Sequence, residues 1–338
     1  MIEVHHMECL SHMRTMADNS VDAIITDPPY FGVKDDDWDN QWRDEAHFIE
    51  WIGELCVEWK RILRPNGSLY CFASPRMSWG VESAIRKHFN VLTNIRWQKP
   101  PFSTKAEMYR KEDLRSYFPA SETIVFAEQF GTDEHAEGEA GYTSACEAVK
   151  RGVFGDYLRL EFERAGVSNR EIAALFPSAT GGLTGCVSNW LQGYNCPTPQ
   201  QYEAMRAFLN NREGEYLRTQ YEELRRPFNV TPEVPYTDVW TFKTVQAYEG
   251  KHVCEKPIAL MEHIVLASTK PGAIVFDPFS GSGSTGVACV MNDRQFIGCE
   301  MDAHWHKYAT ARITKAARQP RLFNFNEQPH QLTIDPAA

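Results

Sequence analysis

Apolar and polar positions along the first 130 residues predict strands and helices in turn. Residues 21–27 are a short, isoleucine-rich apolar run that stops at Asp27 and two prolines, which is typical of a buried strand. Residues 44–63 carry apolar side chains at helical spacing, and a turn at residues 65–67 is expected to end that helix. Further strands are predicted at 68–74, 90–97 and 122–128, with a helix at 77–88. Strands that alternate with helices indicate an α/β sheet.

This pattern breaks in the middle of the chain and returns later. Between Glu128 and Glu147 there are six acidic residues and no lysine or arginine, which predicts an acidic linker. The helical pattern beyond it predicts an inserted helical unit. The expected organisation is a first α/β part at 1–128, the linker at 129–150, the helical insertion at 151–230, a second α/β part at 231–320 and a tail at 321–338. In the second part, helices are predicted at 257–268 and 285–292 and strands at 273–277 and 294–300.

Composition adds limits to this picture. The chain has 338 residues, 43% of them hydrophobic, which is enough to bury a sizeable core. A net charge of −10 argues against a protein that coats nucleic acid non-specifically. Residues 96–115, however, hold six basic and three acidic side chains with aromatic residues between them. Any contact with a nucleic acid would therefore be confined to a local basic surface such as this stretch.

The cysteines and the apolar runs indicate the cellular setting. The nine cysteines include no C-x-x-C pair and no zinc-finger spacing, so neither disulfides nor a structural metal are expected. No apolar run reaches the roughly 18 residues that a membrane span needs. A reduced, cytoplasmic protein that does not bind membranes is expected.

The first motif with chemical meaning follows the predicted strand at 273–277. Gly281, Gly283 and Gly286 fit G-x-G-x-x-G between a strand and a helix, and Glu300 ends the next predicted strand. Glycines let the backbone approach a ligand closely, and the acid can accept hydrogen bonds from ribose hydroxyls. The pattern favours a nucleotide-like cofactor over a bare turn. By itself it does not separate NAD from S-adenosylmethionine.

The second motif is Asp27-Pro28-Pro29-Tyr30, at the carboxyl end of a buried strand. Ligands gather at this end of strands in open α/β sheets. The prolines fix the backbone, so the Asp27 carboxylate and the Pro28 carbonyl can both accept from one exocyclic amino group. Holding both hydrogens frees the nitrogen lone pair for attack on a methyl group, while Tyr30 stacks on the base. The alternative is a rigid loop with no ligand.

Together the two motifs resemble the S-adenosylmethionine-dependent DNA amino-methyltransferases of the beta type. The D-P-P-Y motif precedes F-D-P-F-S-G-S-G-S-T, the reverse of the order in most methyltransferases. Trp97-Gln98-Lys99-Pro100 and Glu255-Lys256-Pro257-Ile258 match further family elements. The resemblance implies a Rossmann-like, doubly wound α/β sheet with circularly permuted motif order and a helical target-recognition insertion.

The resemblance also implies roles for individual residues. Asp27, Pro28, Pro29 and Tyr30 would engage the target amino group and base. Glu8, where the family usually has Gly-Asp, would contact the adenine of the cofactor. The remaining cofactor-binding residues would be Lys256, Pro257, Ile258, Phe276, Asp277, Phe279, Ser280, Gly281, Ser282, Gly283, Thr285 and Glu300.

Two segments are predicted to contact DNA. Residues 170–176 and 187–191 are typical of a helix-turn-helix pair, whose second helix would read base edges in the major groove. A small helical packing domain is the alternative. The predicted contacts are Lys99, Lys105, Arg110 and Lys111 in the basic stretch and Arg170, Ser188, Asn189 and Gln192 in the insertion.

The sequence thus predicts methyl transfer from S-adenosylmethionine to adenine N6 in double-stranded DNA by base flipping. Cytosine N4 is the alternative, although Asp in the first position of D-P-P-Y favours adenine. The permuted motif order argues against an RNA substrate, and the intact motifs argue against a non-catalytic repressor. The chain is expected to act as a monomer or homodimer. The sequence leaves the recognition site and any cognate restriction nuclease open.

Overall fold

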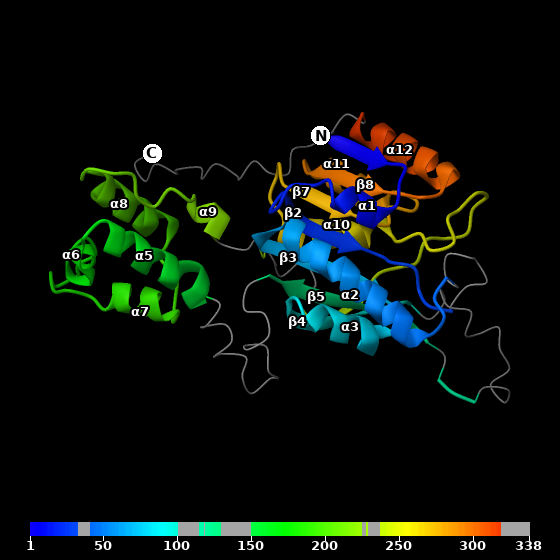
Figure 1. Cartoon of the computed structure of the whole chain (residues 1–338), viewed down its shortest axis with the longest axis horizontal. Helices are drawn as coiled ribbons and strands as arrows, with labels where there is room; N and C mark the ends of the chain where they lie inside the picture. The colour runs from blue at the N-terminus through cyan, green and yellow to red at the C-terminus, as the bar shows by residue number, and fades with distance from the viewer. Residues whose placement is uncertain are drawn as a thin grey trace, which may run out of the picture.

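One sheet organises most of the structure. The computed structural model describes residues 1–32, 41–100, 115–117, 119–129, 150–224, 228 and 237–318. Within these ranges the sheet has eight strands in the order β1-β8-β7-β2-β3-β5-β4-β6 (Figure 1). The strands are β1 (Ile2–His5), β2 (Val21–Thr26), β3 (Leu63–Ala73), β4 (Asn90–Gln98), β5 (Ser121–Glu128), β6 (Val239–Thr241), β7 (Ile274–Asp277) and β8 (Gln295–Cys299).

Strand direction decides which residues meet at the edge of the sheet. β1, β8, β7, β2 and β3 pair in parallel, so their carboxyl ends share one edge. β5 is antiparallel to both of its neighbours, β3 and β4. Its first residues therefore lie at the same edge as the last residues of β4, where Trp97 pairs with Glu122. We call this edge the carboxyl edge of the sheet.

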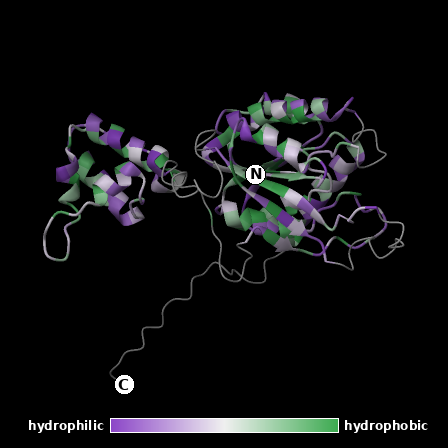
Figure 2. Ribbon diagram, turned by 90° about the horizontal axis from the view of Figure 1, so that it is seen from below, coloured by the Kyte–Doolittle hydropathy of each residue, from purple (hydrophilic) through white to green (hydrophobic). Residues whose placement is uncertain are grey.

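Helices cover both faces of the sheet (Figure 1). One layer consists of α1 (Cys9–Met13), α2 (Glu45–Ile62) and α3 (Ser78–Arg86), and the other of α10 (Ile258–Ser268), α11 (Ser284–Met291) and α12 (Ala303–Ala317). In α2 the apolar stripe predicted from spacing is buried, with Phe48, Ile52, Leu55 and Trp59 in the core. Figure 2 shows hydrophobic strands between these layers. No helix of the described part is both long and apolar enough to cross a membrane.

A second group of helices spans residues 150–224. It comprises η6 (Arg151–Gly155), α5 (Asp156–Arg164), α6 (Asn169–Ala173), α7 (Cys186–Gln192), α8 (Pro199–Asn210) and α9 (Tyr221–Leu224). Their apolar side chains form a core cluster of their own around Leu158, Trp190 and Tyr202. Capping boxes begin α6 at Ser168 and α8 at Thr198, which satisfies backbone N–H groups at both helix starts.

Most predicted elements are confirmed, and one boundary is wrong. The expected turn at residues 65–67 does not separate the helix from the strand, because α2 ends at Ile62 and β3 begins at Leu63. Leu63 pairs with Val21 and Ser68 with Ala23, so the residues between them form a bulge within the strand. β1, α1, β6 and α12 were not predicted. Most of the predicted linker, residues 130–149, and the predicted tail lie outside the described residues.

The separate core of the helical group leads to a stability prediction. Trp190 is 2% exposed and packs edge-on against Phe176. We expect Trp190→Ala to destabilise this group by about 3–5 kcal/mol, because it leaves a large cavity. In urea unfolding, the midpoint of the transition of the helical group should fall, while the midpoint of the transition of the sheet domain should not change. The exposed Leu183→Ala serves as the matched control. An equal shift of both transitions would mean that the two cores unfold as one unit.

Candidate active site

Three acidic residues mark the carboxyl edge of the sheet. Asp27 follows β2, Asp277 ends β7 and Glu300 follows β8. Because these strands are parallel, the three side chains are brought to one region of the surface. Asp27 and Asp277 are close enough for the charge of Asp27 to help raise the pKa of Asp277. The two sequence motifs, about 250 residues apart in the chain, thus form one site.

Asp27 is held on one side by a lysine. Its Oδ2 lies 2.5 Å from Nζ of Lys256, whose side chain is only 8% exposed. Nζ of Lys256 also lies 3.4 Å from Oε2 of Glu122. Oδ1 of Asp27 is buried and has no hydrogen-bond partner among the described residues. Burial raises the pKa of Asp27, and the adjacent Lys256 charge acts against that rise.

Tyr30 lies next to Asp27 and contacts both Glu122 and Lys256. Its hydroxyl donates to Oε2 of Glu122 at 3.2 Å. Burial and the nearby carboxylates of Asp27 and Glu122 raise the pKa of this hydroxyl, so it lies close to both acids. Nζ of Lys256 lies 5.5 Å from the ring centroid, within cation–π distance. Pro28 is buried and Pro29 half-buried, so the backbone between Asp27 and Tyr30 has little freedom. The motif therefore presents an acceptor atom and an aromatic ring with fixed orientation.

The glycine-rich turn lies between β7 and α11. Gly281 and Gly283 have φ values of +50° and +78°, a backbone conformation that favours glycine. Asp277 supports the turn, because its Oδ2 accepts from the Thr285 hydroxyl at 2.6 Å and its Oδ1 from the Phe279 N–H at 3.1 Å. Phe276 is fully buried in the core beneath the turn.

The third glycine of the motif serves packing. A Cβ on Gly286 would lie 2.4 Å from Cδ1 of Ile313, so only glycine lets α11 approach α12 this closely. The hydroxyl of Ser280 lies beside Gly298 of β8 and is buried, with no hydrogen-bond partner in the described part of the chain. A buried unsatisfied hydroxyl is costly, and it marks a position where a polar ligand group fits.

Two further acids were predicted to contact a cofactor, and both also serve the fold. Glu300 accepts from the N–H groups of Gly281 at 2.8 Å and Asp302 at 2.9 Å, so it ties the turn to β8. Glu8 caps the start of α1 by accepting from the N–H groups of Leu10 and Ser11. A carboxylate oxygen accepts more than one hydrogen bond, so these bonds leave room for a ligand.

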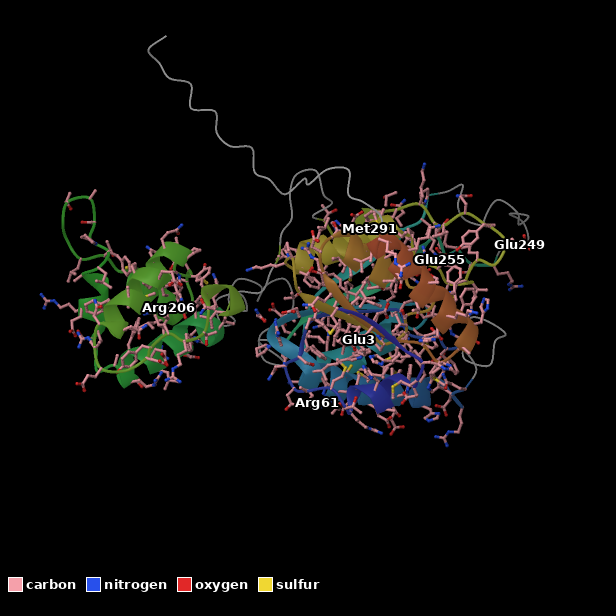
Figure 3. All side chains as sticks on the ribbon, turned by 90° about the horizontal axis from the view of Figure 1, so that it is seen from above. Glu3, Arg61, Arg206, Glu249, Glu255 and Met291 are labelled. Carbon is pink, nitrogen blue, oxygen red and sulfur yellow. The ribbon has the colours of Figure 1, made fainter. Side chains whose placement is uncertain are left out.

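The segment before α10 lies across the glycine turn. A Cβ on Gly281 would lie 3.3 Å from the His252 ring, so this ring covers the turn. Glu255 pairs with Arg312 of α12 at 2.8 Å, and Figure 3 labels Glu255 beside that helix. Arg312 in turn donates to the Ser282 carbonyl at 3.1 Å. Pro257 and Ile258 lead into α10. Lys256 alone turns away from this network and toward Asp27.

Comparisons with known proteins match this architecture. The family model N6_N4_Mtase, described as DNA methylase, matches residues 21–311. The chain belongs to this DNA methylase family. It is 25% identical over 317 residues to DNA adenine methyltransferase YhdJ of Escherichia coli (strain K12), covering 92% of this chain and 82% of that one. It is also 25% identical over 329 residues to the Type II methyltransferase M2.DpnII of Streptococcus pneumoniae, covering 91% and 88%.

A solved structure shows the same fold. The M1.HpyAVI–SAM complex aligns with a TM-score of 0.51 at 21% identity, covering 93% of this chain and 99% of that one. The predicted Rossmann-like α/β methyltransferase fold is confirmed. The permuted motif order remains a prediction at this point.

The residues predicted to contact DNA lie in three places: beside the site, in the helical group and outside the described residues. Lys99 is ion-paired with Glu122 at 2.5 Å, and its side chain is 23% exposed. Arg170 on α6 and Ser188 and Gln192 on α7 are exposed, and Asn189 is half-buried. Lys105, Arg110 and Lys111 lie outside the described residues.

Sequence reasoning missed Glu122. It begins the apolar run of β5, and an acid at the start of such a run is usually solvated. The only signal would have been strand direction, because an antiparallel β5 places its first residues at the carboxyl edge. Nothing in the local sequence specifies that direction.

The burial of Asp277 predicts a pH dependence of stability. Burial raises its pKa from an ordinary 3.8 to about 7. Between these values the folded state binds more protons than the unfolded state, so stability falls as pH rises. From about pH 4.5 to 7.5 we expect a loss of about 3 kcal/mol in unfolding free energy that Asp277→Asn lacks. Urea titrations at both pH values measure it. Parallel pH curves for the two proteins would contradict the assignment.

Proposed function

We propose that this chain transfers a methyl group from S-adenosylmethionine to N6 of adenine in double-stranded DNA, with the base flipped out of the helix. The observation that carries the proposal is Oδ1 of Asp27, a buried acceptor without a hydrogen-bond partner among the described residues. It lies at the carboxyl edge of the sheet, next to a glycine turn shaped for a cofactor. An exocyclic amino group would supply the missing donor.

The glycine turn fits S-adenosylmethionine. When bound, this cofactor supplies a methyl group activated by a sulfonium. The turn around Phe279, Gly281 and Ser282, with the unsatisfied Ser280 hydroxyl, would hold its methionine half. Glu300 would accept from the ribose hydroxyls, and Glu8 lies at the start of α1 for an adenine contact. The His252 ring and the Glu255–Arg312 pair would keep water away from the turn.

The residues of D-P-P-Y would act on the target base. Asp27 Oδ1 and the Pro28 carbonyl would accept the two hydrogens of the amino group, which draws the nitrogen lone pair out of the ring system. Tyr30, with its hydroxyl held by Glu122, would stack on the base and keep the nitrogen in line for attack. Pro29 fixes the chain between these groups.

The choice of adenine rests on the first residue of the motif and on relatives. Asp27 favours adenine, and YhdJ is named a DNA adenine methyltransferase. The family covers both N6 and N4 amines, so cytosine N4 remains the alternative. With D-P-P-Y at residues 27–30 and the glycine turn at 281–286, the motif order supports the beta type with its circular permutation.

The helical group at 150–224 is proposed as the target-recognition unit. α6 and α7 pack together as a helix pair, and α7 exposes Ser188 and Gln192. Side chains of these types read base edges in the major groove. The likeness to a Type II methyltransferase fits a role beside a restriction nuclease. The chain would act in the cytoplasm, as a monomer or homodimer.

The role of Asp27 is tested by its removal. We expect Asp27→Ala to lower the methylation rate by at least about 10³-fold, because the amino group loses the acceptor that polarises it. Cofactor affinity should stay within about twofold, since the glycine turn is intact. Transfer of labelled methyl groups to DNA and titration with S-adenosylmethionine measure the two quantities. Equal labelling by the variant and the native chain would overturn the catalytic assignment, and no labelling by the native chain would overturn the enzyme proposal.

The recognition role of α7 is tested by Gln192→Ala. Loss of one base-reading side chain should cost about 1–3 kcal/mol of discrimination and relax one position of the methylated site. Sequencing modified bases in DNA from cells that express either protein reads this change directly. Leu183→Ala, exposed in the loop before α7, is the control. An unchanged recognition site would place sequence reading elsewhere in the chain.

A further inference from the structure

Four charged side chains of alternating sign form a chain along the carboxyl edge. Lys99 Nζ lies 2.5 Å from Glu122 Oε1, Glu122 Oε2 lies 3.4 Å from Lys256 Nζ, and Lys256 Nζ lies 2.5 Å from Asp27 Oδ2. They come from the end of β4, the start of β5, the segment before α10 and the end of β2. We call these four residues the charge chain.

The charge chain is balanced, and it is poorly accessible to solvent. It holds two lysines and two carboxylates, and their side chains are 8% to 23% exposed. Buried charges are tolerated when each has a partner, and removing one leaves an uncompensated charge. Burial alone would raise the pKa of Glu122, but the charges of Lys256 and Lys99 lower it. Glu122 is therefore ionised and is the negative centre between the two lysines.

Glu122 is the member that contacts both groups beside Asp27. Its Oε2 accepts from the Tyr30 hydroxyl at 3.2 Å and faces the Lys256 ammonium. Its Oε1 is held by Lys99, which limits the rotation of the carboxylate. The Lys256 ammonium also lies over the Tyr30 ring. One carboxylate thus fixes both the ammonium that grips Asp27 and the ring proposed to stack on the base.

The contact of Lys256 with Oδ2 of Asp27 has a direct consequence for the other oxygen of that carboxylate. Because Oδ2 is taken by Lys256, Oδ1 is left as the buried acceptor with no partner among the described residues. We propose that Glu122, held by Lys99, is a positioning residue that keeps Lys256 on Oδ2 of Asp27 and so presents Oδ1 to the target amino group. This inference rests on the proposed methyl transfer to an amino group.

A purely structural role would have a different signature. An ion pair that only fastened β5 to β4 would change stability when removed, and the rate of transfer would follow the fraction of folded protein. A positioning role changes the turnover of folded, cofactor-bound protein. It also makes the effect of Glu122 depend on Lys99, because both set the balance of the charge chain.

The experiment compares Glu122→Gln, Lys99→Met and the double variant, using the full chain. For Glu122→Gln we expect kcat to fall about 10- to 100-fold, with cofactor affinity and the KM for DNA within about threefold of native values. Lys99→Met should lower kcat about 3- to 10-fold. In the double variant the remaining charges of Lys256 and Asp27 balance, so its kcat should equal or exceed that of Glu122→Gln. If the two single-variant losses simply multiplied, its kcat would be far lower.

Glu82→Gln is the matched control, because it removes a carboxylate that pairs with Arg86 on α3, outside the site. Its kcat should stay near the native value. A native kcat for Glu122→Gln, or losses that multiply in the double variant, would overturn the positioning role while leaving the proposed function intact. If Glu122→Gln fails to bind cofactor, the test rests on Lys99→Met. A native kcat for Lys99→Met would then overturn the positioning role. A native chain that does not methylate DNA would overturn the proposed function itself.

Discussion

The contact between Lys256 and Asp27 is the interaction on which the site depends. A carboxylate buried at the end of β2 would be driven toward its neutral form, and the ammonium 2.5 Å away opposes that. The same contact occupies Oδ2 and leaves Oδ1 without a partner among the described residues. It also joins two distant parts of the chain, because Asp27 follows β2 and Lys256 precedes α10. The acceptor proposed for the target amino group and the turn proposed for the cofactor are thereby held together.

The sheet supplies the geometry for this contact. Parallel strands bring Asp27, Asp277 and Glu300 to one edge, and the single reversal at β5 adds Glu122 to them. Buried charge is sustained there because the charge chain is balanced. The helical group proposed to recognise DNA has a hydrophobic core of its own, separate from the two clusters that pack on the sheet.

Sequence patterns predicted the strands and helices that carry strong periodicity, including β2, α2 and α11. They also placed both motifs at strand ends, where the structure has them. They failed where tertiary pairing decides, as in the bulge of β3, which absorbs the residues expected to form a turn. Lys99 was predicted to contact DNA, and no role was predicted for Glu122. Their roles depend on the direction of β5, which no local spacing encodes.

The reaction proposed for this site is methylation of the exocyclic amine of adenine. The most direct measurement is digestion of DNA to nucleosides after incubation with the native chain and S-adenosylmethionine carrying a labelled methyl group, followed by chromatographic separation. We expect the label to co-migrate with N6-methyl-2′-deoxyadenosine. Label in N4-methyl-2′-deoxycytidine would make cytosine the target base, and an absence of label in DNA would mean that this chain does not methylate DNA.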